Sequence, residues 1–203
     1  MSVVSLLLAI AMLVIVAVNF RQGVWACAIQ LIAVIFSAII ATMLFEPFGA
    51  LVEKSVGILW QYGDFLGAWL IFGGVLGGLT YLSTRLSKVR VRFPKLVDQL
   101  GGLAISLLTA WVFVCFASMT LHIAPISRVA FFGSFEAEKP IFFGYRPDWA
   151  WLEFSQNCSL GVYSNGNVFD PKGDFIIRGI AKREHFDLAP SNFEARGVIQ
   201  APR

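Results

Sequence analysis

The side chains best suited to chemistry are few and widely spaced in this 203-residue chain. The three cysteines, Cys27, Cys115 and Cys158, show no paired spacing, and the first two lie in apolar runs, so neither a disulfide nor a zinc site is predicted. The two histidines, His122 and His185, are far apart and have no cluster of ligating residues around them. We therefore expect both histidines to have plain surface or interface roles.

Catalytic motifs are equally scarce. The sequence contains no phosphate-binding loop, nucleophile elbow or metalloprotease helix. The tripeptide 157–159 spells a glycosylation acceptor, Asn-Cys-Ser, which is a weak signal on its own. We expect a non-enzymatic protein with no catalytic residue, no cofactor and no bound metal.

Four long apolar stretches dominate the first 122 residues, at 3–18, 24–45, about 65–82 and about 100–121. A helix of roughly 20 residues crosses a hydrocarbon core of about 30 Å, and backbone groups in lipid must bond internally. Each stretch is therefore predicted to be a transmembrane helix. The first has no basic residues before it and no small-residue cleavage site after it, which favours a retained anchor over a signal peptide. We expect Pro47 to end the second helix.

The composition changes abruptly after these stretches. Residues 1–122 hold 7 basic and 4 acidic side chains, whereas residues 123–203 hold 9 of each, so the net charge of +3 comes from the first part. Such a balance argues for membrane topology and against nucleic-acid binding, which needs a basic face on a soluble domain. We predict an all-α membrane protein, a four-transmembrane-helix bundle of residues 1–122 with a small extracytoplasmic C-terminal tail of residues 123–203.

The loop between the third and fourth predicted helices is strongly basic. Lys and Arg in short loops stay on the cytoplasmic side, so this loop is predicted to be cytoplasmic and both termini extracytoplasmic. The same side chains are predicted to contact anionic lipid head groups. They are Arg85, Lys88, Arg90, Arg92 and Lys95.

Small residues at helical spacing form stripes on three of the predicted spans. Helices in lipid associate through such residues because they allow close backbone approach, so these stripes are predicted to join the spans in one bundle. The alternative for the third helix is a pore lining or a hinge. No charge lies inside a predicted span, so a proton or ion relay is unsupported. The stripes are Gly73, Gly74, Gly77 and Gly78; Gly102, Ser106 and Ala110; and Ala33, Ser37 and Ala41.

The tail is rich in aromatic residues, which suits either a segment at the head-group level or, as we favour, a marginal mini-domain with its own core. Asp148 is predicted to cap a short helix that carries Trp151 and ends at Gly161. Turn signals occupy 164–167 and 170–173, and Asp174 is predicted to open a segment that reaches Ile180. A flexible end is expected after about residue 184.

Residues 1–122 resemble the colicin V production protein family of bacterial inner-membrane proteins. The likeness rests on the four-span hydropathy, on Arg21-Gln22-Gly23 before the long second helix, and on Asp98 followed by Gly101-Gly102 at the start of the fourth. The resemblance implies a four-span protein without a catalytic signature. It also implies a role in the production or export of a peptide toxin and in cell-envelope maintenance.

Four positions depart from that family pattern. Cys27 replaces an acidic residue, Ser106 and Ala110 replace glycines, and Thr109 replaces a basic residue. The small-residue stripe is kept and the charges are lost, so any activity that depends on those charges in relatives is not implied here. Two other functions stay open: a subunit of a small homo-oligomeric channel or transporter, and a membrane anchor that presents the tail to an envelope or export partner.

Overall fold

A computed structural model describes residues 3–55, 62–86, 93–124, 140–160 and 168–180 of the protein. The helices follow one another in a simple order, and these ranges contain no named strand. They are α1 (Val3–Asn19), the short 3-10 helix η1 (Phe20–Gln22), α2 (Val24–Ser55), α3 (Gly63–Leu86), α4 (Lys95–Ile123) and α5 (Pro147–Leu160).

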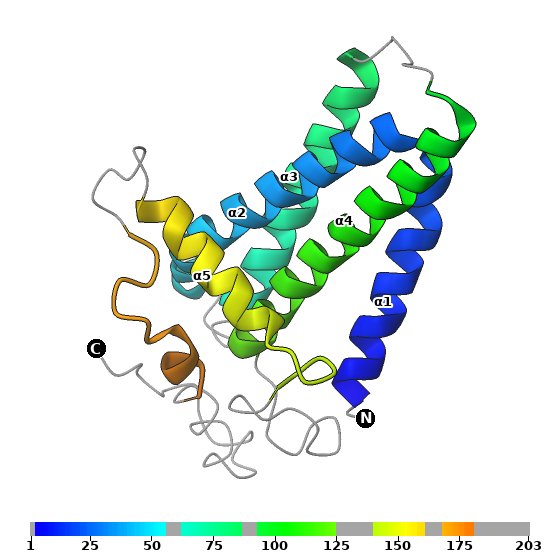
Figure 1. The fold of residues 1–203 in the computed structure, drawn as a ribbon. Helices are drawn as coiled ribbons and strands as arrows, with labels where there is room; N and C mark the ends of the chain where they lie inside the picture. Colours follow the sequence, from blue (N-terminus) through cyan, green and yellow to red (C-terminus); the bar gives the residue numbers. More distant parts are fainter. Residues whose placement is uncertain (1–2, 56–61, 87–92, 125–139, 161–167, 181–203) are drawn as a thin grey trace.

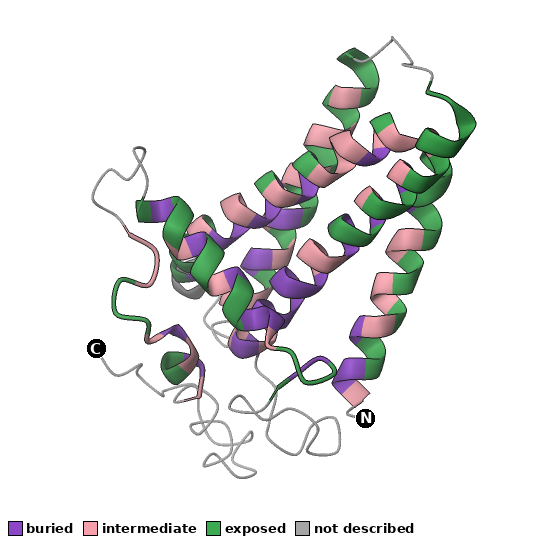
Figure 2. Ribbon diagram, viewed as in Figure 1, coloured by how far each residue is buried: buried purple, intermediate pink, exposed green. Residues whose placement is uncertain are grey.

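Four of these helices are long and apolar enough to cross a membrane, namely α1 with η1, α2, α3 and α4. Figure 1 shows the four as one bundle, with α5 lying across α2 and α4. Buried positions concentrate on α2 and α4, whereas the outer sides of α1 and α3 are largely exposed (Figure 2). The predicted all-α bundle with four spans is confirmed, and the chain is a multi-pass membrane protein.

The second helix is longer than the sequence predicted. We expected Pro47 to end it, but α2 continues through Pro47 as far as Ser55. A proline inside a helix removes one backbone hydrogen bond and costs about 3 kcal/mol or more. The prediction was wrong because it weighed this local cost without the packing of α2 against α3, which offsets it.

That packing depends on glycines that the sequence analysis did not single out. A Cβ atom on Gly63 would lie 3.3 Å from the carbonyl oxygen of Gly49. A Cβ atom on Gly67 would lie 2.8 Å from the ring of Phe48. Close approach of two backbones through small residues is the usual basis of helix association in lipid. The crossing of α2 and α3 is thus made here, around Pro47.

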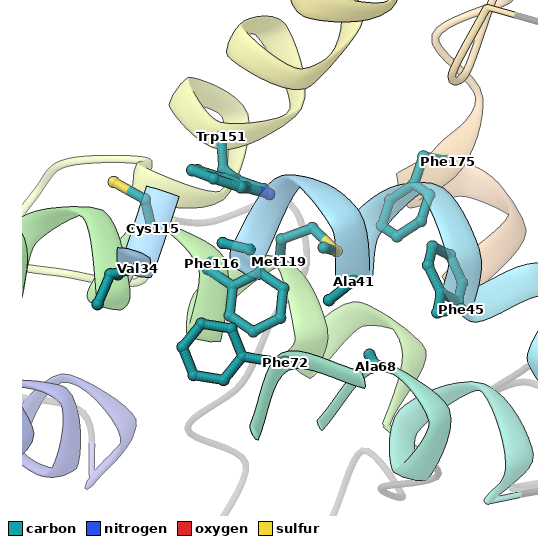
Figure 3. Packing of buried hydrophobic residues seen from close by; sticks show 11 residues of the cluster. Val34, Ala41, Phe45, Ala68, Phe72, Cys115, Phe116, Met119, Trp151 and Phe175 are labelled. Atoms are coloured by element: carbon teal, nitrogen blue, oxygen red, sulfur yellow. The ribbon is translucent and has the colours of Figure 1, made fainter. Parts of the chain in front are cut away.

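One hydrophobic core extends from the bundle into the tail (Figure 3). Phe72 of α3 stacks on Phe116 of α4 with ring centroids 4.8 Å apart, and Phe116 in turn meets Trp151 of α5 at 6.0 Å. Phe175 packs edge-on against Phe45 of α2 at 6.1 Å. The described part of the tail therefore shares the core of the spans, which differs from the mini-domain with its own core that we expected.

The first helix is fixed to the same structure at its N-terminal end. Val4 and Leu8 of α1 pack with Val114 and with residues 141–142 in a second apolar cluster. The hydroxyl of Ser5 donates a hydrogen bond to the carbonyl oxygen of Ile141. Residues before α5 thereby lie against the start of α1 (Figure 1).

Candidate functional site

The residues that carry the family resemblance lie together at one end of the bundle. The backbone N–H of Val24, the first residue of α2, donates a 2.9 Å hydrogen bond to Oδ1 of Asp98 on α4. The first N–H groups of a helix have no partner within the helix, and a carboxylate there also interacts favourably with the helix dipole. Asp98 therefore caps α2 from another span. We call Gly23, Val24, Asp98, Gly101 and Gly102 the Asp98 joint.

Glycine is required at the turn itself. Gly23 has φ +87° and ψ 160°, a conformation that residues with a side chain rarely adopt. A Cβ atom at this position would also lie 3.0 Å from Oδ1 of Asp98. The turn and the cap thus depend on each other.

The two glycines after Asp98 let α4 approach the turn closely. A Cβ atom on Gly101 would lie 2.9 Å from Cγ2 of Val24. One on Gly102 would lie 3.4 Å from the carbonyl oxygen of Phe20. Residues that are more than seventy positions apart in sequence therefore make one compact contact.

Two departures from the family pattern touch each other beside this joint. The thiol of Cys27 donates a hydrogen bond to the carbonyl oxygen of Asn19 at 3.1 Å, and its Sγ lies 3.4 Å from Oγ of Ser106. Both side chains are buried. An acidic residue at position 27 would place its charge in this buried contact. The departures from the family pattern at positions 27 and 106 therefore change the same buried contact between α2 and α4.

The predicted small-residue stripes have different surroundings. Gly102, Ser106 and Ala110 are buried in the packing of α4, and Thr109 is buried beside them with its hydroxyl bonded to the carbonyl oxygen of Ile105. The stripe on α3 is exposed instead, and among the described residues no atom beyond the adjacent backbone of α3 lies within 4 Å of a Cβ built there. The structure thus brings the α4 residues into the bundle but not Gly73, Gly74, Gly77 and Gly78.

The predicted basic end is described in part. Arg21, Arg85 and Lys95 are exposed, and the Arg85 guanidinium lies 5.2 Å from the ring centroid of Tyr81. The end of α3 and the start of α4 lie at one end of the bundle (Figure 1), which holds the Asp98 joint and Arg21, two residues before Gly23. Lys88, Arg90 and Arg92 fall outside the described residues.

A second polar contact, which the sequence analysis missed, lies at the other end of α4. Nε2 of His122 is 3.0 Å from Oδ2 of Asp148, and both side chains are fully buried. Of the two roles expected for His122, surface or interface, the surface role is wrong, since α5 covers this side chain. No spacing pattern in the sequence predicts this contact, because the two residues are 26 positions apart and belong to different helices.

Two further contacts surround the buried pair. The indole N–H of Trp151 donates a 3.0 Å hydrogen bond to the hydroxyl of Thr42 on α2. A Cβ atom on Gly179 would lie 2.6 Å from the carbonyl oxygen of His122. The end of α4 is thus the place where α5 and the segment 168–180 are attached to the spans.

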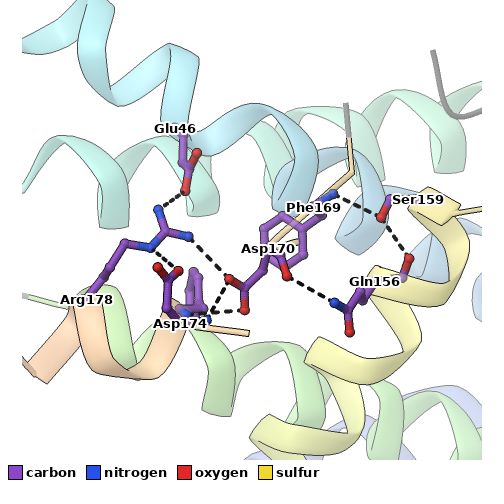
Figure 4. Close-up of polar contacts among 8 residues, drawn as sticks. Glu46, Gln156, Ser159, Phe169, Asp170, Asp174 and Arg178 are labelled. Carbon is purple, nitrogen blue, oxygen red and sulfur yellow. Dashed lines mark hydrogen bonds and ion pairs between the residues drawn. The ribbon is translucent and has the colours of Figure 1, made fainter. Parts of the chain in front are cut away.

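An ion-pair network joins that segment to α2 (Figure 4). Arg178 lies 3.2 Å from Glu46 and 2.9 Å from Asp174, and the side chains of Arg178 and Glu46 are about half exposed. Asp170 accepts hydrogen bonds from the N–H groups of Asp174 and Phe175, and residues 175–180 are helical. The predicted turn at 170–173 and the segment to Ile180 are confirmed. Gly161, the turn at 164–167 and the end after 184 lie outside the described residues.

The polar contacts described at the Asp98 joint and at His122 hold helices together. Across the described ranges, no three His, Cys, Asp or Glu side chains gather as a metal site would require. Comparison with known proteins gave no match to a family model, a curated protein or a solved structure. The resemblance to colicin V production proteins therefore rests on the four-span hydropathy and on Arg21-Gln22-Gly23, Asp98 and Gly101-Gly102.

Proposed function

We propose that this chain is a non-enzymatic inner-membrane protein of the colicin V production type, which supports production or export of a peptide toxin and maintenance of the bacterial envelope. One observation supports it. The separated residues on which the resemblance rests, Arg21-Gln22-Gly23, Asp98 and Gly101-Gly102, adjoin one capped helix start. The resemblance thus concerns a single structural unit and not scattered positions.

A complementation experiment tests this proposal. A bacterium that lacks its own colicin V production protein and carries the toxin operon would receive this chain, a Gly23→Val, Asp98→Ala variant, or the control Leu13→Ala, whose side chain is exposed on α1. We expect the chain and the control to restore secreted toxin and growth on detergent, and the double variant to fail. Failure of the unchanged chain to restore either, at normal membrane levels, would contradict the proposal.

The proposed orientation places the Asp98 joint on the cytoplasmic side of the membrane and the His122 end on the extracytoplasmic side, because of the basic loop between α3 and α4. A reporter that is active only in the cytoplasm, fused after Arg203, should be inactive. Activity of that fusion would overturn this orientation.

A second candidate, a subunit of a small oligomeric channel, is favoured by the exposed glycines of α3. Four spans alone enclose little space, so a channel needs several copies, and these glycines would let helices of two copies approach closely. Solute and ion efflux from liposomes that contain the protein, compared with Gly74→Leu and Gly78→Leu variants, is the test. Flux that the variants lose would favour the channel, and absence of flux from the inserted protein would exclude it.

A third candidate, an anchor that presents the tail to an envelope or export partner, must allow for the attachment of α5 to the bundle. Deletion after Ile123 would uncover His122, so loss of function on deletion would not separate binding from folding. Trp149→Ala on the exposed side of α5 is the cleaner variant. Full activity of this variant would argue against a partner at that surface.

A further inference from the structure

The helix α5 buries polar side chains and exposes large apolar ones on its flanks, which is the reverse of what is expected for such side chains in water. Asp148, Ser155 and Ser159 lie on its buried side, beside Trp151. Its flanks expose Trp149 at 56%, Phe154 at 41% and Leu160 at 58%. A helix on a soluble protein buries its apolar stripe and exposes the polar one, whereas in a membrane polar groups face the bundle interior.

The aromatic surface continues into the turn that precedes α5. Phe143 and Tyr145 are exposed there, at 54% and 67%. The guanidinium of Arg146 lies 4.8 Å from the ring centroid of Trp149. Aromatic rings beside basic side chains are typical of the level at which lipid head groups meet the acyl chains.

Two contacts fix the depth of α5 relative to the spans. Trp151 bonds Thr42, which lies one turn, or about 6 Å, inward of Glu46 along α2. Trp151 also packs on Phe116, about 9 Å inward of His122 along α4. Glu46 marks a polar boundary, because its half-exposed carboxylate pairs with Arg178. Trp151 of α5 therefore lies inward of the end of α4 and inward of the Glu46–Arg178 pair on α2, and not beyond the ends of the spans.

The length and the outermost residues of α5 exclude a crossing. Its 14 residues extend about 21 Å, less than the hydrocarbon thickness of about 30 Å. Glu153 and Asn157 are exposed between the two apolar flanks. Figure 1 shows α5 lying across the bundle, and the position of these two residues suits a helix near the surface of a membrane.

We propose that α5 is an interfacial membrane helix, whose exposed aromatic flanks contact phospholipid at the boundary of head groups and acyl chains, in the leaflet at the His122 end of the bundle. The buried polar side attaches this helix to α2 and α4. This inference does not depend on the proposed role in toxin export.

The protein supplies its own reporter for a test. Cys158 is exposed and lies one turn after Phe154 on the same flank, while Cys27 and Cys115 are buried. The full chain in nanodiscs of phosphatidylethanolamine and phosphatidylglycerol would be spin-labelled at Cys158, with Cys158→Ser giving the background. A matched aqueous control is Lys172→Cys in the Cys158→Ser chain, because Lys172 is exposed in the polar turn 170–173.

The measurement compares relaxation of each label by oxygen, which concentrates in lipid, and by a water-soluble nickel chelate. We expect the ratio of oxygen to chelate accessibility to be severalfold higher at Cys158 than at position 172. Equal ratios with high chelate access would place α5 in water and overturn the proposal. Low access to both agents at Cys158 would mean that protein covers this flank, which would also overturn it.

Discussion

The two ends of α4 are each tied to a distant helix by an aspartate, but the contacts are of different kinds. Asp98 bonds a backbone N–H at the start of α2, beside glycines that leave room for it. Asp148 of α5 bonds the side chain of His122, and both partners are buried completely. A backbone cap can be replaced by water or by another oxygen, whereas a buried pair leaves one group stranded when the other is removed. The end at His122 should therefore be the more sensitive to substitution.

The largest effect is expected from His122→Ala. Loss of one partner of a buried pair leaves the Asp148 carboxylate without compensation and costs about 3–5 kcal/mol. Unfolding of the reconstituted protein, followed by protease resistance of α5, would measure this loss. Asp174→Asn, at a partly exposed position, is the control, and a cost for His122→Ala equal to that of the control would contradict the prediction.

The next effect concerns the turn of the Asp98 joint. Gly23→Ala should cost about 1–3 kcal/mol from the backbone conformation alone, with a further loss from the contact with Asp98. Gly144→Ala is a matched control, because Gly144 also has a positive φ of 85° but no described atom within 4 Å of an added Cβ. Equal costs at the two positions, measured by unfolding in the same nanodiscs, would mean that Asp98 contributes nothing at Gly23.

A smaller loss is expected at the cap itself. Asp98→Ala should reduce stability by about 0.5–2 kcal/mol, as is usual when a helix loses its capping side chain. Asp98→Asn keeps an oxygen for the N–H of Val24 and should retain most of the stability. The comparison of the two variants in the unfolding assay separates capping from packing, and equal losses would argue against the cap.

The smallest effect is expected for the exposed pair between Glu46 and Arg178. Surface ion pairs contribute about 0–1 kcal/mol and are screened by salt. Glu46→Gln should therefore shift stability by less than 1 kcal/mol, and the shift should vanish at high salt. A larger loss that persists in salt would contradict this prediction and would mean that the network contributes as much to stability as the buried pair does.

The size of these effects does not follow what the sequence could predict, since the largest is expected at a contact that the sequence did not reveal. Hydropathy predicted the four spans, and the resemblance picked out Gly23, Asp98, Gly101 and Gly102. The contact among them was not predicted, because it joins residues more than seventy positions apart. The sequence did not predict the continuation of α2 through Pro47, which depends on Gly63 and Gly67 of another helix. Nor did it predict the burial of His122, since its partner lies on a helix that only the tertiary fold brings near.

The aromatic residues of the tail gave an ambiguous signal for the same reason. Trp151 and Trp149 are two positions apart, yet one is buried against Thr42 and the other is exposed. Amino-acid composition alone predicts the same degree of burial for both tryptophans. Only the position of α5 on the spans separates a residue that attaches the helix from one that faces outward.

The most direct test of this account is a double-mutant cycle on the buried pair. His122→Leu, Asp148→Leu and the double variant would be unfolded in nanodiscs and compared with the unchanged chain. If the pair attaches α5 to the spans, each single variant loses several kcal/mol and the double variant recovers about 2 kcal/mol or more of the summed loss. Losses that add to within about 0.5 kcal/mol would show that the two side chains act independently and would contradict the account.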